Sequence, residues 1–419
     1  MTVAGRLGPV VEGMLGRRLP LRLRCWDGSS VGPADAPATL VVRHRRALRR
    51  MIWAPNELGL ARAYVSGDLD IDGDLFAVLD LANTGPSRPD LTFSRRSLVG
   101  GLVGLGALGL PPAPPPEELR LSGRLHTRAR DRRAVSAHYD VSNEFYRRIL
   151  GESMVYSCAY WPSPDVSLTQ AQDAKCALVA RKLGLSAGMR MLDVGCGWGS
   201  MLLHAAREHG VRGVGVTLSR EQADLARKRV AEAGLTDLVE IRLQDYRDVD
   251  DGPYDAIASI GMAEHVGAER FGQYAGRLYG LLRPGGRLLN HQITQSQPVG
   301  GSTRTSFITH YVFPDGELLP LGSVVGELEN VGFEVRDVES LREHYARTLR
   351  AWVKNLEASW EPAVGMTSPG RARVWRLYMA GSALTFEAGR ISVHQALAIK
   401  PGPGGASGVP PTRAEWLGS

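Results

Sequence analysis

The stretch Met191-Leu-Asp-Val-Gly-Cys-Gly-Trp-Gly-Ser200 decides the fold of this chain. A buried strand pattern enters three glycines at alternating positions, Gly195, Gly197 and Gly199, and a helical pattern follows. Glycines at such a turn let a ligand approach the backbone more closely than a Cβ would allow, and the helix N-terminus offers free N–H groups. The spacing is not the dinucleotide pattern G-x-G-x-x-G, because Trp198 and Gly199 follow Gly197 directly.

Strands and helices alternate around this turn. The patterns predict strands over 189–194, 212–218, 239–243, 254–260 and 287–294, and helices over 200–209 and 220–233. Short strands joined by helices indicate a parallel sheet that is covered on both faces. The sequence therefore predicts an α/β, doubly wound, Rossmann-like domain whose ligand lies at the carboxyl ends of the strands.

Turn-rich and proline-rich segments divide the chain. Residues 83–90 (NTGPSRPD) and 111–116 (PPAPPP) interrupt the regular patterns. We expect an α+β accessory domain over 1–85, a Gly/Pro-rich linker over 86–130, a catalytic domain over 131–400 and a flexible tail over 401–419. In the first domain, the patterns predict strands over 21–26 and 39–43 and a helix over 56–66.

Composition excludes several classes of protein. A chain of 419 residues that is 43% hydrophobic can bury a large core. Its four cysteines are too few for a disulfide framework and lack metal-ligand spacing, so we expect a reduced, cytoplasmic setting and no metal. No apolar run reaches the roughly 20 residues of a membrane-spanning helix, and no signal peptide is evident. The closest run, 97–110, is either a buried hinge or a flap that touches lipid.

The net charge of +6 is unevenly distributed. Residues 1–50 hold ten arginines against three acidic residues, and residues 120–133 hold six arginines against Asp131. Such an excess fits an anionic membrane surface, or a solvated basic face in a chain with 45 arginines and only 5 lysines. Nucleic acid is disfavoured, since the catalytic half is not basic and has no stacking motif.

The pattern D-x-G-x-G-x-G from Asp193 resembles motif I of S-adenosylmethionine-dependent methyltransferases. Such enzymes commonly carry an acid for the ribose hydroxyls after the second strand, where this chain offers Thr217 and Gln222. After the third strand, Asp245 could accept from the adenine amino group while Tyr246 packs on the ring. The expected cofactor-binding residues are Tyr156, Ser157, Asp193, Gly195, Gly197, Gly199, Thr217, Leu218, Gln222, Gln244, Asp245 and Tyr246.

Five ordered motifs resemble the cyclopropane-fatty-acyl-phospholipid synthase family. They span 138–146, 156–161, 192–199, 261–267 and 344–349, and residues 58–68 extend the likeness loosely into the first domain. This family includes mycolic acid cyclopropane and methoxy synthases and 10-methylene fatty acid synthases. The resemblance implies a methyltransferase that acts on the cis double bond of an unsaturated phospholipid acyl chain, docks peripherally on the inner face of the membrane, and has S-adenosylmethionine and bicarbonate as cofactors.

The implied reaction passes through a carbocation that must be shielded from water and then deprotonated. It calls for aromatic faces, an apolar channel and a base. The aromatic candidates, many of which must be core, are Tyr139, Tyr156, Tyr160, Trp161, Phe307, Tyr311, Phe313, Tyr345 and Trp352.

In similar enzymes a bicarbonate ion is the base. The resemblance assigns it to Glu264, His291, Tyr345 and the backbones of Cys158 and Ile293. A nucleophilic thiol at Cys158 is the alternative, but no basic neighbour in sequence would lower its pKa, and methyl transfer needs no covalent enzyme intermediate.

Residues 386–395 and the first domain look more like the actinobacterial branch that makes 10-methylene fatty acids, whose product a separate reductase would convert to a methyl branch. A cyclopropane product needs the same cofactor and base. A methyltransferase with another substrate and a non-catalytic lipid-binding protein are more distant alternatives. The sequence leaves a homo-oligomeric state open.

Overall fold

The computed structural model describes residues 2–15, 18–84, 105, 109–119, 127–128, 130–133, 142–295 and 306–417. The chain forms two compact units. The first unit contains Met1–Arg120, Ser302–Val312 and Trp360–Leu384, and the second contains Leu121–Gly301, Phe313–Ser359 and Thr385–Ser419. This division differs from the expected one, because two segments from the second half of the chain belong to the N-terminal unit.

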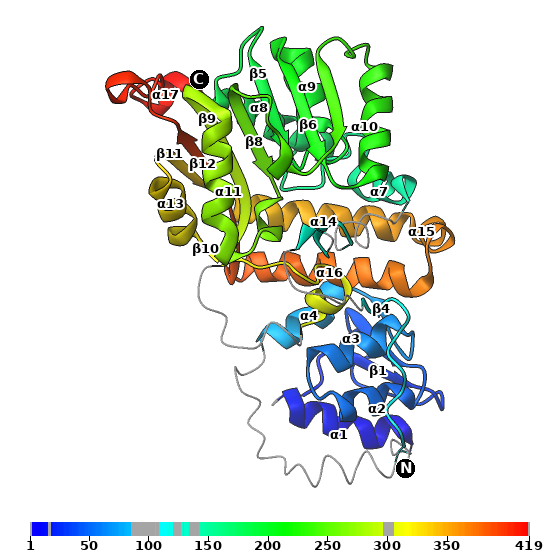
Figure 1. Ribbon diagram of the computed structural model, residues 1–419. Helices are drawn as coiled ribbons and strands as arrows, with labels where there is room; N and C mark the ends of the chain where they lie inside the picture. Colours follow the sequence, from blue (N-terminus) through cyan, green and yellow to red (C-terminus); the bar gives the residue numbers. More distant parts are fainter. Residues whose placement is uncertain are drawn as a thin grey trace. The chain divides into compact units, whose positions relative to one another are not determined.

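An eight-stranded sheet forms the centre of the second unit (Figure 1). Its order is β11-β12-β9-β8-β5-β6-β7, and β10 pairs with β9. The five strands from β9 to β7 run parallel to one another, whereas β12 runs antiparallel to both of its neighbours, β9 and β11. The strands are β5 (Arg190–Val194), β6 (Arg212–Thr217), β7 (Val239–Leu243), β8 (Tyr254–Ile260), β9 (Leu282–Gln295), β10 (Leu319–Pro320), β11 (Glu334–Ser340) and β12 (Ile391–Ile399). The α/β fold is thus confirmed, and the strand order reverses between β5 and β8, where such sheets bind ligands.

Helices cover both faces of this sheet (Figure 1). Apolar residues of α8, α9 and α10 pack on one face, and those of α11 and α13 pack on the other. Side chains alternate accordingly along the strands, since Leu289 joins the first cluster and Leu288 the second. The helices of this unit are α7 (Asn143–Leu150), α8 (Leu168–Leu183), α9 (Ser200–His209), α10 (Arg220–Glu232), α11 (Ala268–Leu281), α13 (Leu321–Asn330), α14 (Arg342–Ala358) and α17 (Arg413–Leu417).

Local sequence sets several of these boundaries. Ser167 and Gln170 form a capping box at the start of α8, and Gly184 ends that helix in the left-handed conformation. The bounds of α9, β7 and β8 agree with the predicted ranges. β9 begins at Leu282, five residues earlier than predicted, because Leu282 pairs with Tyr254 of β8 across an irregularity in the register.

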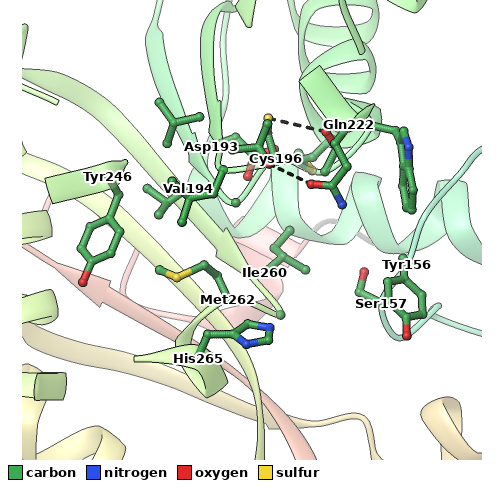
Figure 2. Close-up of a pocket in the computed structure, with 18 of the residues that line it drawn as sticks. Tyr156, Ser157, Asp193, Val194, Cys196, Gln222, Tyr246, Ile260, Met262 and His265 are labelled. Carbon is green, nitrogen blue, oxygen red and sulfur yellow. Dashed lines mark hydrogen bonds between the residues drawn. The ribbon is translucent and has the colours of Figure 1, made fainter. Parts of the chain in front are cut away.

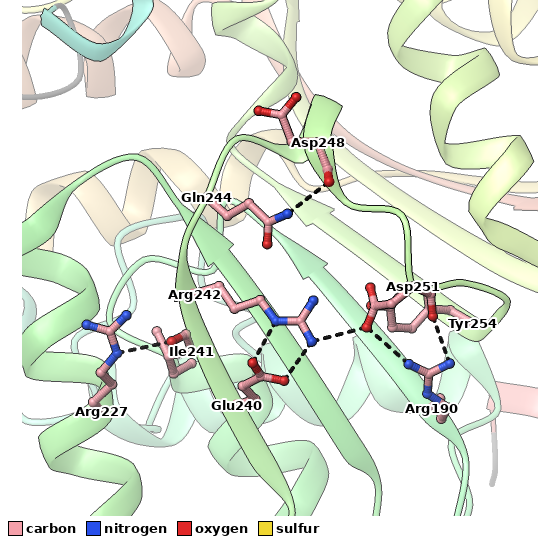
Figure 3. A network of polar contacts seen from close by, with 9 residues as sticks. All are labelled: Arg190, Arg227, Glu240, Ile241, Arg242, Gln244, Asp248, Asp251 and Tyr254. Carbon is pink, nitrogen blue, oxygen red and sulfur yellow. Dashed lines mark hydrogen bonds and ion pairs between the residues drawn. The ribbon is translucent and has the colours of Figure 1, made fainter.

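A polar network joins Arg242 of β7 to the starts of β8 and β5 (Figure 3). The carboxylate of Asp251 accepts from Arg242 at 3.1 Å, from Arg190 at 3.3 Å and from the Tyr254 hydroxyl at 2.7 Å. The hydrogen bond from Arg242 is the main reason that the Asp251 pKa falls to about 2. The network holds together the amino ends of β5 and β8, which lie opposite the ligand-binding end of the sheet.

The first unit is an α+β module. Its sheet has the order β2-β1-β3-β4. Its elements are α1 (Val3–Leu15), β1 (Arg22–Cys25), β2 (Ser30–Val31), β3 (Ala38–Val42), α2 (Arg46–Trp53), α3 (Glu57–Val65), β4 (Leu69–Gly73), α4 (Leu75–Thr84), α12 (Phe307–Tyr311), α15 (Trp360–Met366) and most of α16 (Pro369–Glu387). The predicted strands appear as β1 and β3, and the predicted helix appears as α3, which Asn56 caps.

The expected linker and tail contain defined structure. Arg50 donates to the carbonyl of Ala113, so part of 86–130 packs on the first unit. In the tail, α17 contacts α8, and Arg287 donates to the carbonyl of Gly408 at 2.8 Å. Of the apolar run 97–110, all but Leu105, Gly109 and Leu110 lies outside the described residues.

All four cysteines are free and buried. Within the described ranges, no helix is both long enough and apolar enough to cross a membrane.

The side chain of Lys182 provides a test of this packing. It is fully buried and joins α8 to β11 through Glu339 at 2.5 Å and Asp337 at 3.2 Å. We expect Lys182→Met to lower the free energy of unfolding by about 3 kcal/mol, because Asp337 would stay buried with the loss of this partner and would keep Arg413. Urea denaturation measures this loss. Lys228→Met, which removes an exposed pair with Glu232, is the control and should cost less than about 1 kcal/mol. Equal losses in both variants would contradict the assigned role of Lys182.

Candidate active site

The glycine-rich turn lies between β5 and α9. Gly195 and Gly197 have φ values of +78° and +53°, which residues other than glycine rarely adopt. A Cβ on Gly195 would lie 2.9 Å from Met262, whereas a Cβ on Gly197 would project into open space. The N–H groups of Gly195 and Cys196 donate to the carbonyl of Val216, which ties the turn to β6. The turn therefore holds its backbone open toward a neighbouring cavity.

A cavity lies at the carboxyl ends of β5, β6 and β8, with the turn on its wall (Figure 2). Ten of the twelve residues expected to bind the cofactor line it: Tyr156, Ser157, Asp193, Gly195, Gly197, Thr217, Leu218, Gln222, Gln244 and Tyr246. Gly199 is not on the wall; it lies at the N-cap of α9. Sequence reasoning missed other lining residues, including Lys175, Met262, His265 and Arg247. Met262 and His265 lie in the motif 261–267, from which only Glu264 was assigned a role.

Opposite charges occupy one part of this wall. Asp193 and Lys175 are each 2% exposed. Burial raises the pKa of Asp193 to about 7, and the positive charge of Lys175 opposes that rise. A buried acid and a buried amine on one cavity wall are complementary to the zwitterionic end of an amino acid.

Thr217 and Gln222 replace the acid that is usual after the second strand. The Thr217 hydroxyl donates to Gln222 Oε1 at 2.8 Å and accepts from the Ser219 N–H at 3.2 Å. Gln222 projects into the cavity in Figure 2. The pair offers neutral hydrogen-bonding groups where hydroxyl groups of a ligand would lie.

Asp245 does not line the cavity, contrary to expectation. Its carboxylate accepts from Arg247, two residues away, at Nε (2.8 Å) and Nη2 (2.6 Å). Burial alone would raise the pKa of Asp245, but these hydrogen bonds outweigh it and lower the pKa. Arg247 also binds Asp131 at 3.0 Å and itself reaches the wall. The group presented to a ligand here is therefore the guanidinium, beside the ring of Tyr246.

A second polar cluster, the base site, lies behind the loop that follows β8. It contains Glu264, His291 and Ile293. Glu264 Oε1 accepts from the Ile293 N–H at 2.8 Å, and the Gly261 N–H donates to the carbonyl of His291. Gly261 also lines the cavity, so the base site adjoins it. The Ile293 N–H, expected to hold an anion, is already used by Glu264.

Burial sets the protonation of the base site. Burial raises the pKa of Glu264 to about 7, although the hydrogen bond from the Ile293 N–H favours the charged carboxylate. Burial lowers the pKa of His291 to about 3, and the charge of Lys175 adds to that effect, so the imidazole is neutral at neutral pH. Among the described residues, Glu264 Oε2 and both ring nitrogens of His291 are buried and have no hydrogen-bond partner. Such atoms indicate a polar ligand or water.

Cys158 and Tyr345 lie near the start of α14. Cys158 is fully buried, and its thiol lies 3.1 Å from the carbonyl of Ala159 and 3.6 Å from that of Leu341. Burial raises the pKa of this thiol well above its usual value, which makes it a poor nucleophile. Tyr345 packs on Phe386 at 4.8 Å and edge-on to Trp352 at 6.1 Å.

The other aromatic candidates separate into groups. Tyr156 lies 5.5 Å from Trp352, which extends the aromatic contacts from the cavity wall to Tyr345. Phe307 and Tyr311 stack on each other in the first unit. Tyr139 lies outside the described residues.

The raised pKa of Glu264 predicts a pH-dependent stability. Because the folded chain binds this proton more tightly than the unfolded chain, stability falls as the pH rises from about 4.5 to about 7. We expect Glu264→Gln to remove this contribution, so the variant should gain about 3 kcal/mol relative to the native chain between pH 4.5 and pH 8. Denaturant titrations at several pH values measure the difference. Glu329→Gln, at an exposed position on α13, controls for the loss of an acid; a pH-independent difference for Glu264→Gln would refute the assignment.

Comparisons with known proteins agree with this geometry. The family model described as mycolic acid cyclopropane synthetase matches residues 126–396. The probable fatty acid methyltransferase Rv3720 of Mycobacterium tuberculosis is 45% identical over 93% of this chain and 93% of its own length. The tuberculostearic acid methyltransferase UfaA1 of the same species is 36% identical over 92% of this chain and 89% of its own length.

Solved structures give the same family. The crystal structure of mycolic acid cyclopropane synthase CmaA1 complexed with SAH and CTAB has a TM-score of 0.61 and 36% identity, and covers 64% of this chain and 97% of that chain. The chain therefore belongs to the mycolic acid cyclopropane synthetase family and is an S-adenosylmethionine-dependent methyltransferase of the cyclopropane synthase type.

Proposed function

We propose that this chain methylates the cis double bond of an unsaturated phospholipid acyl chain and that its product is a 10-methylene fatty acid. The observation that carries the proposal is the base site beside the cofactor cavity. Glu264 and His291 are both buried there, and three of their polar atoms have no hydrogen-bond partner in the described ranges. A methyltransferase that only binds and methylates a basic nitrogen has no need of such a site.

The reaction needs a base after the carbon–carbon bond has formed. S-adenosylmethionine, when bound, supplies an electrophilic methyl group. The π electrons of the double bond form the new bond and the electrons of the methyl–sulfur bond stay on sulfur, which leaves a cation on the acyl chain. A hydride shift and loss of one methyl proton give the exomethylene group, whereas loss of a methyl proton with ring closure gives cyclopropane.

The aromatic side chains suit such a cation. Tyr156 lies on the cavity wall, and its contact with Trp352 leads to Tyr345. All three are aromatic faces that stabilise positive charge without acting as nucleophiles toward it. Trp352 is fully buried and Tyr345 is 7% exposed, so this region excludes water.

Bicarbonate in the base site would supply the proton acceptor. The residues fit an anion of this kind. Glu264, with a pKa of about 7, can keep its proton and donate it, and neutral His291 carries one ring N–H. Within the described residues, the Cys158 N–H has no hydrogen-bond acceptor, which leaves it available as a further donor.

The relatives that match most of this chain favour the fatty acid branch. Rv3720 and UfaA1 carry names of fatty acid and tuberculostearic acid methyltransferases and match the first unit as well as the second. Cyclopropane mycolic acid synthase 1 of M. tuberculosis matches only 62% of this chain. A cyclopropane product is the second candidate, because it needs the same cofactor and base. A separate reductase would act on the exomethylene product.

Lipids from cells that express the protein test the proposal. Fatty acid methyl esters should show unsaturated chains that have gained one CH2 group, and proton NMR should show vinylidene rather than cyclopropane protons. Glu264→Gln should lower product at least about 100-fold while the purified variant still binds SAH. Glu329→Gln should leave product unchanged. Cyclopropane signals would select the second candidate, and unchanged turnover of Glu264→Gln would refute the role of the base site.

We also propose that the first unit docks on the inner face of the cell membrane. Residues 1–84 of this unit have a smaller excess of positive charge than residues 1–50 alone, since they hold eleven arginines and nine acidic residues. Arg24, Arg43 and Arg46 pair with Asp72, Asp70 and Asp68. Exposed apolar side chains accompany the remaining charge. Trp53 is 58% exposed, and its indole N–H donates to the carbonyl of Gly109. The next residue, Leu110, is 86% exposed. An amphipathic indole of this kind suits a membrane interface.

This docking predicts a specific loss of binding. Trp53→Ser should reduce co-sedimentation with vesicles of anionic phospholipid several-fold, because the indole no longer inserts at the interface. Val31→Ser, at another exposed apolar position of the first unit, is the control and should bind like the native chain. Binding that is abolished by salt and is identical in all three proteins would leave the arginines as the contact and exclude Trp53.

A further inference from the structure

Gln395 lies on β12, directly opposite His291 on β9. Paired residues on neighbouring antiparallel strands point to the same face of the sheet. Gln395 is fully buried and His291 is 2% exposed. Within the part of the chain that the structure describes, neither the amide oxygen and nitrogen of Gln395 nor the two ring nitrogens of His291 have a hydrogen-bond partner. Four buried polar atoms therefore share one position on the sheet and lack partners.

The base site continues from this pair. Glu264 Oε2 is also buried without a partner, and Glu264 Oε1 is held by Ile293, two residues beyond His291. On the other side, the thiol of Cys158 contacts the carbonyl of Leu341, and the Leu341 N–H donates to Val393, two residues before Gln395. Four of these five atoms thus belong to the paired residues Gln395 and His291, and the fifth belongs to Glu264, which is bound to the same strand through Ile293.

The cost of burying such atoms indicates an occupant. A buried polar group without a partner costs about 1–3 kcal/mol. The base site also needs one more hydrogen-bond donor, because the Ile293 N–H already donates to Glu264. Gln395 supplies both a donor and an acceptor and keeps both at any pH near neutral. Bicarbonate needs both kinds of partner, since it has acceptor oxygens and one hydroxyl.

We propose that Gln395 is a ligand of the bicarbonate in the base site, donating from its amide nitrogen and accepting the bicarbonate hydroxyl at its amide oxygen. The inference rests on the proposed function, which requires this anion. Gln395 thereby takes the place that the Ile293 N–H gives up to Glu264, and it orients the anion beside His291.

The test measures bicarbonate binding directly. In CO2-free buffer, the melting temperature of the native protein should rise with added bicarbonate in a saturable way. Gln395→Leu keeps the approximate volume and removes both polar atoms, so half-saturation should need at least about tenfold more bicarbonate. Gln395→Glu keeps size and polarity but replaces the donor with an acid, and it should weaken binding as well. SAH binding shows that each variant is folded.

Gln292→Leu is the matched control. Gln292 is 1% exposed on the same strand as His291 but on the opposite face, where its amide oxygen accepts from Asn290 and its amide nitrogen has no partner among the described residues. The two glutamines therefore differ in the face of the sheet on which they lie. It should keep the native half-saturation. Native half-saturation in Gln395→Leu would overturn the role of Gln395 alone. A native protein whose melting temperature and turnover both ignore bicarbonate would overturn the proposed base and, with it, the inference.

Discussion

The hydrogen bond from the Ile293 N–H to Glu264 Oε1 joins the two parts of the site. Glu264 lies in the loop after β8, whose neighbours Met262 and His265 line the cofactor cavity. Ile293 lies near the carboxyl end of β9, the strand that also carries His291. One contact of 2.8 Å therefore fixes the cavity wall to the base site, so that in the proposed reaction the base would lie near the methyl group that the cofactor supplies. Because the contact uses a backbone N–H, no substitution of the Ile293 side chain other than proline removes the donor.

The sequence predicts the second unit well because its signals are local. A buried strand, a glycine turn and a helix follow each other within 191–200, and the same periods recur to residue 260. The parallel order of the strands then follows from the connections. Asp245 shows where local reasoning fails, since its neighbour Arg247 occupies the carboxylate. The pattern contains both residues, but only the fold decides which of them faces the cavity.

Local sequence patterns do not predict which segments that are distant in sequence pack together. Nothing in the spacing of 302–312 and 360–384 indicates that they belong to the N-terminal unit. The ion pairs of β4 could not be predicted either. Asp70 and Asp72, two residues apart on this strand, pair with Arg43 and Arg24. Residues 1–50 carry an excess of arginine, but four of these ten arginines, Arg24, Arg43, Arg46 and Arg50, pair with aspartates of residues 68–72. Lys175 is a further example, because a lysine on a helix is ordinarily solvated, whereas this one is buried against the motif I acid.

Lys175 also explains how a site of neutral donors can hold an anion. Glu264, with a pKa near neutrality, and neutral His291 offer hydrogen bonds but no positive charge. The charge of Lys175 acts on both Asp193 and His291, so its field reaches the cofactor cavity and the base site. In a low-dielectric interior this field is poorly screened. A bound anion would oppose the field of Lys175 and raise the pKa of the His291 imidazole.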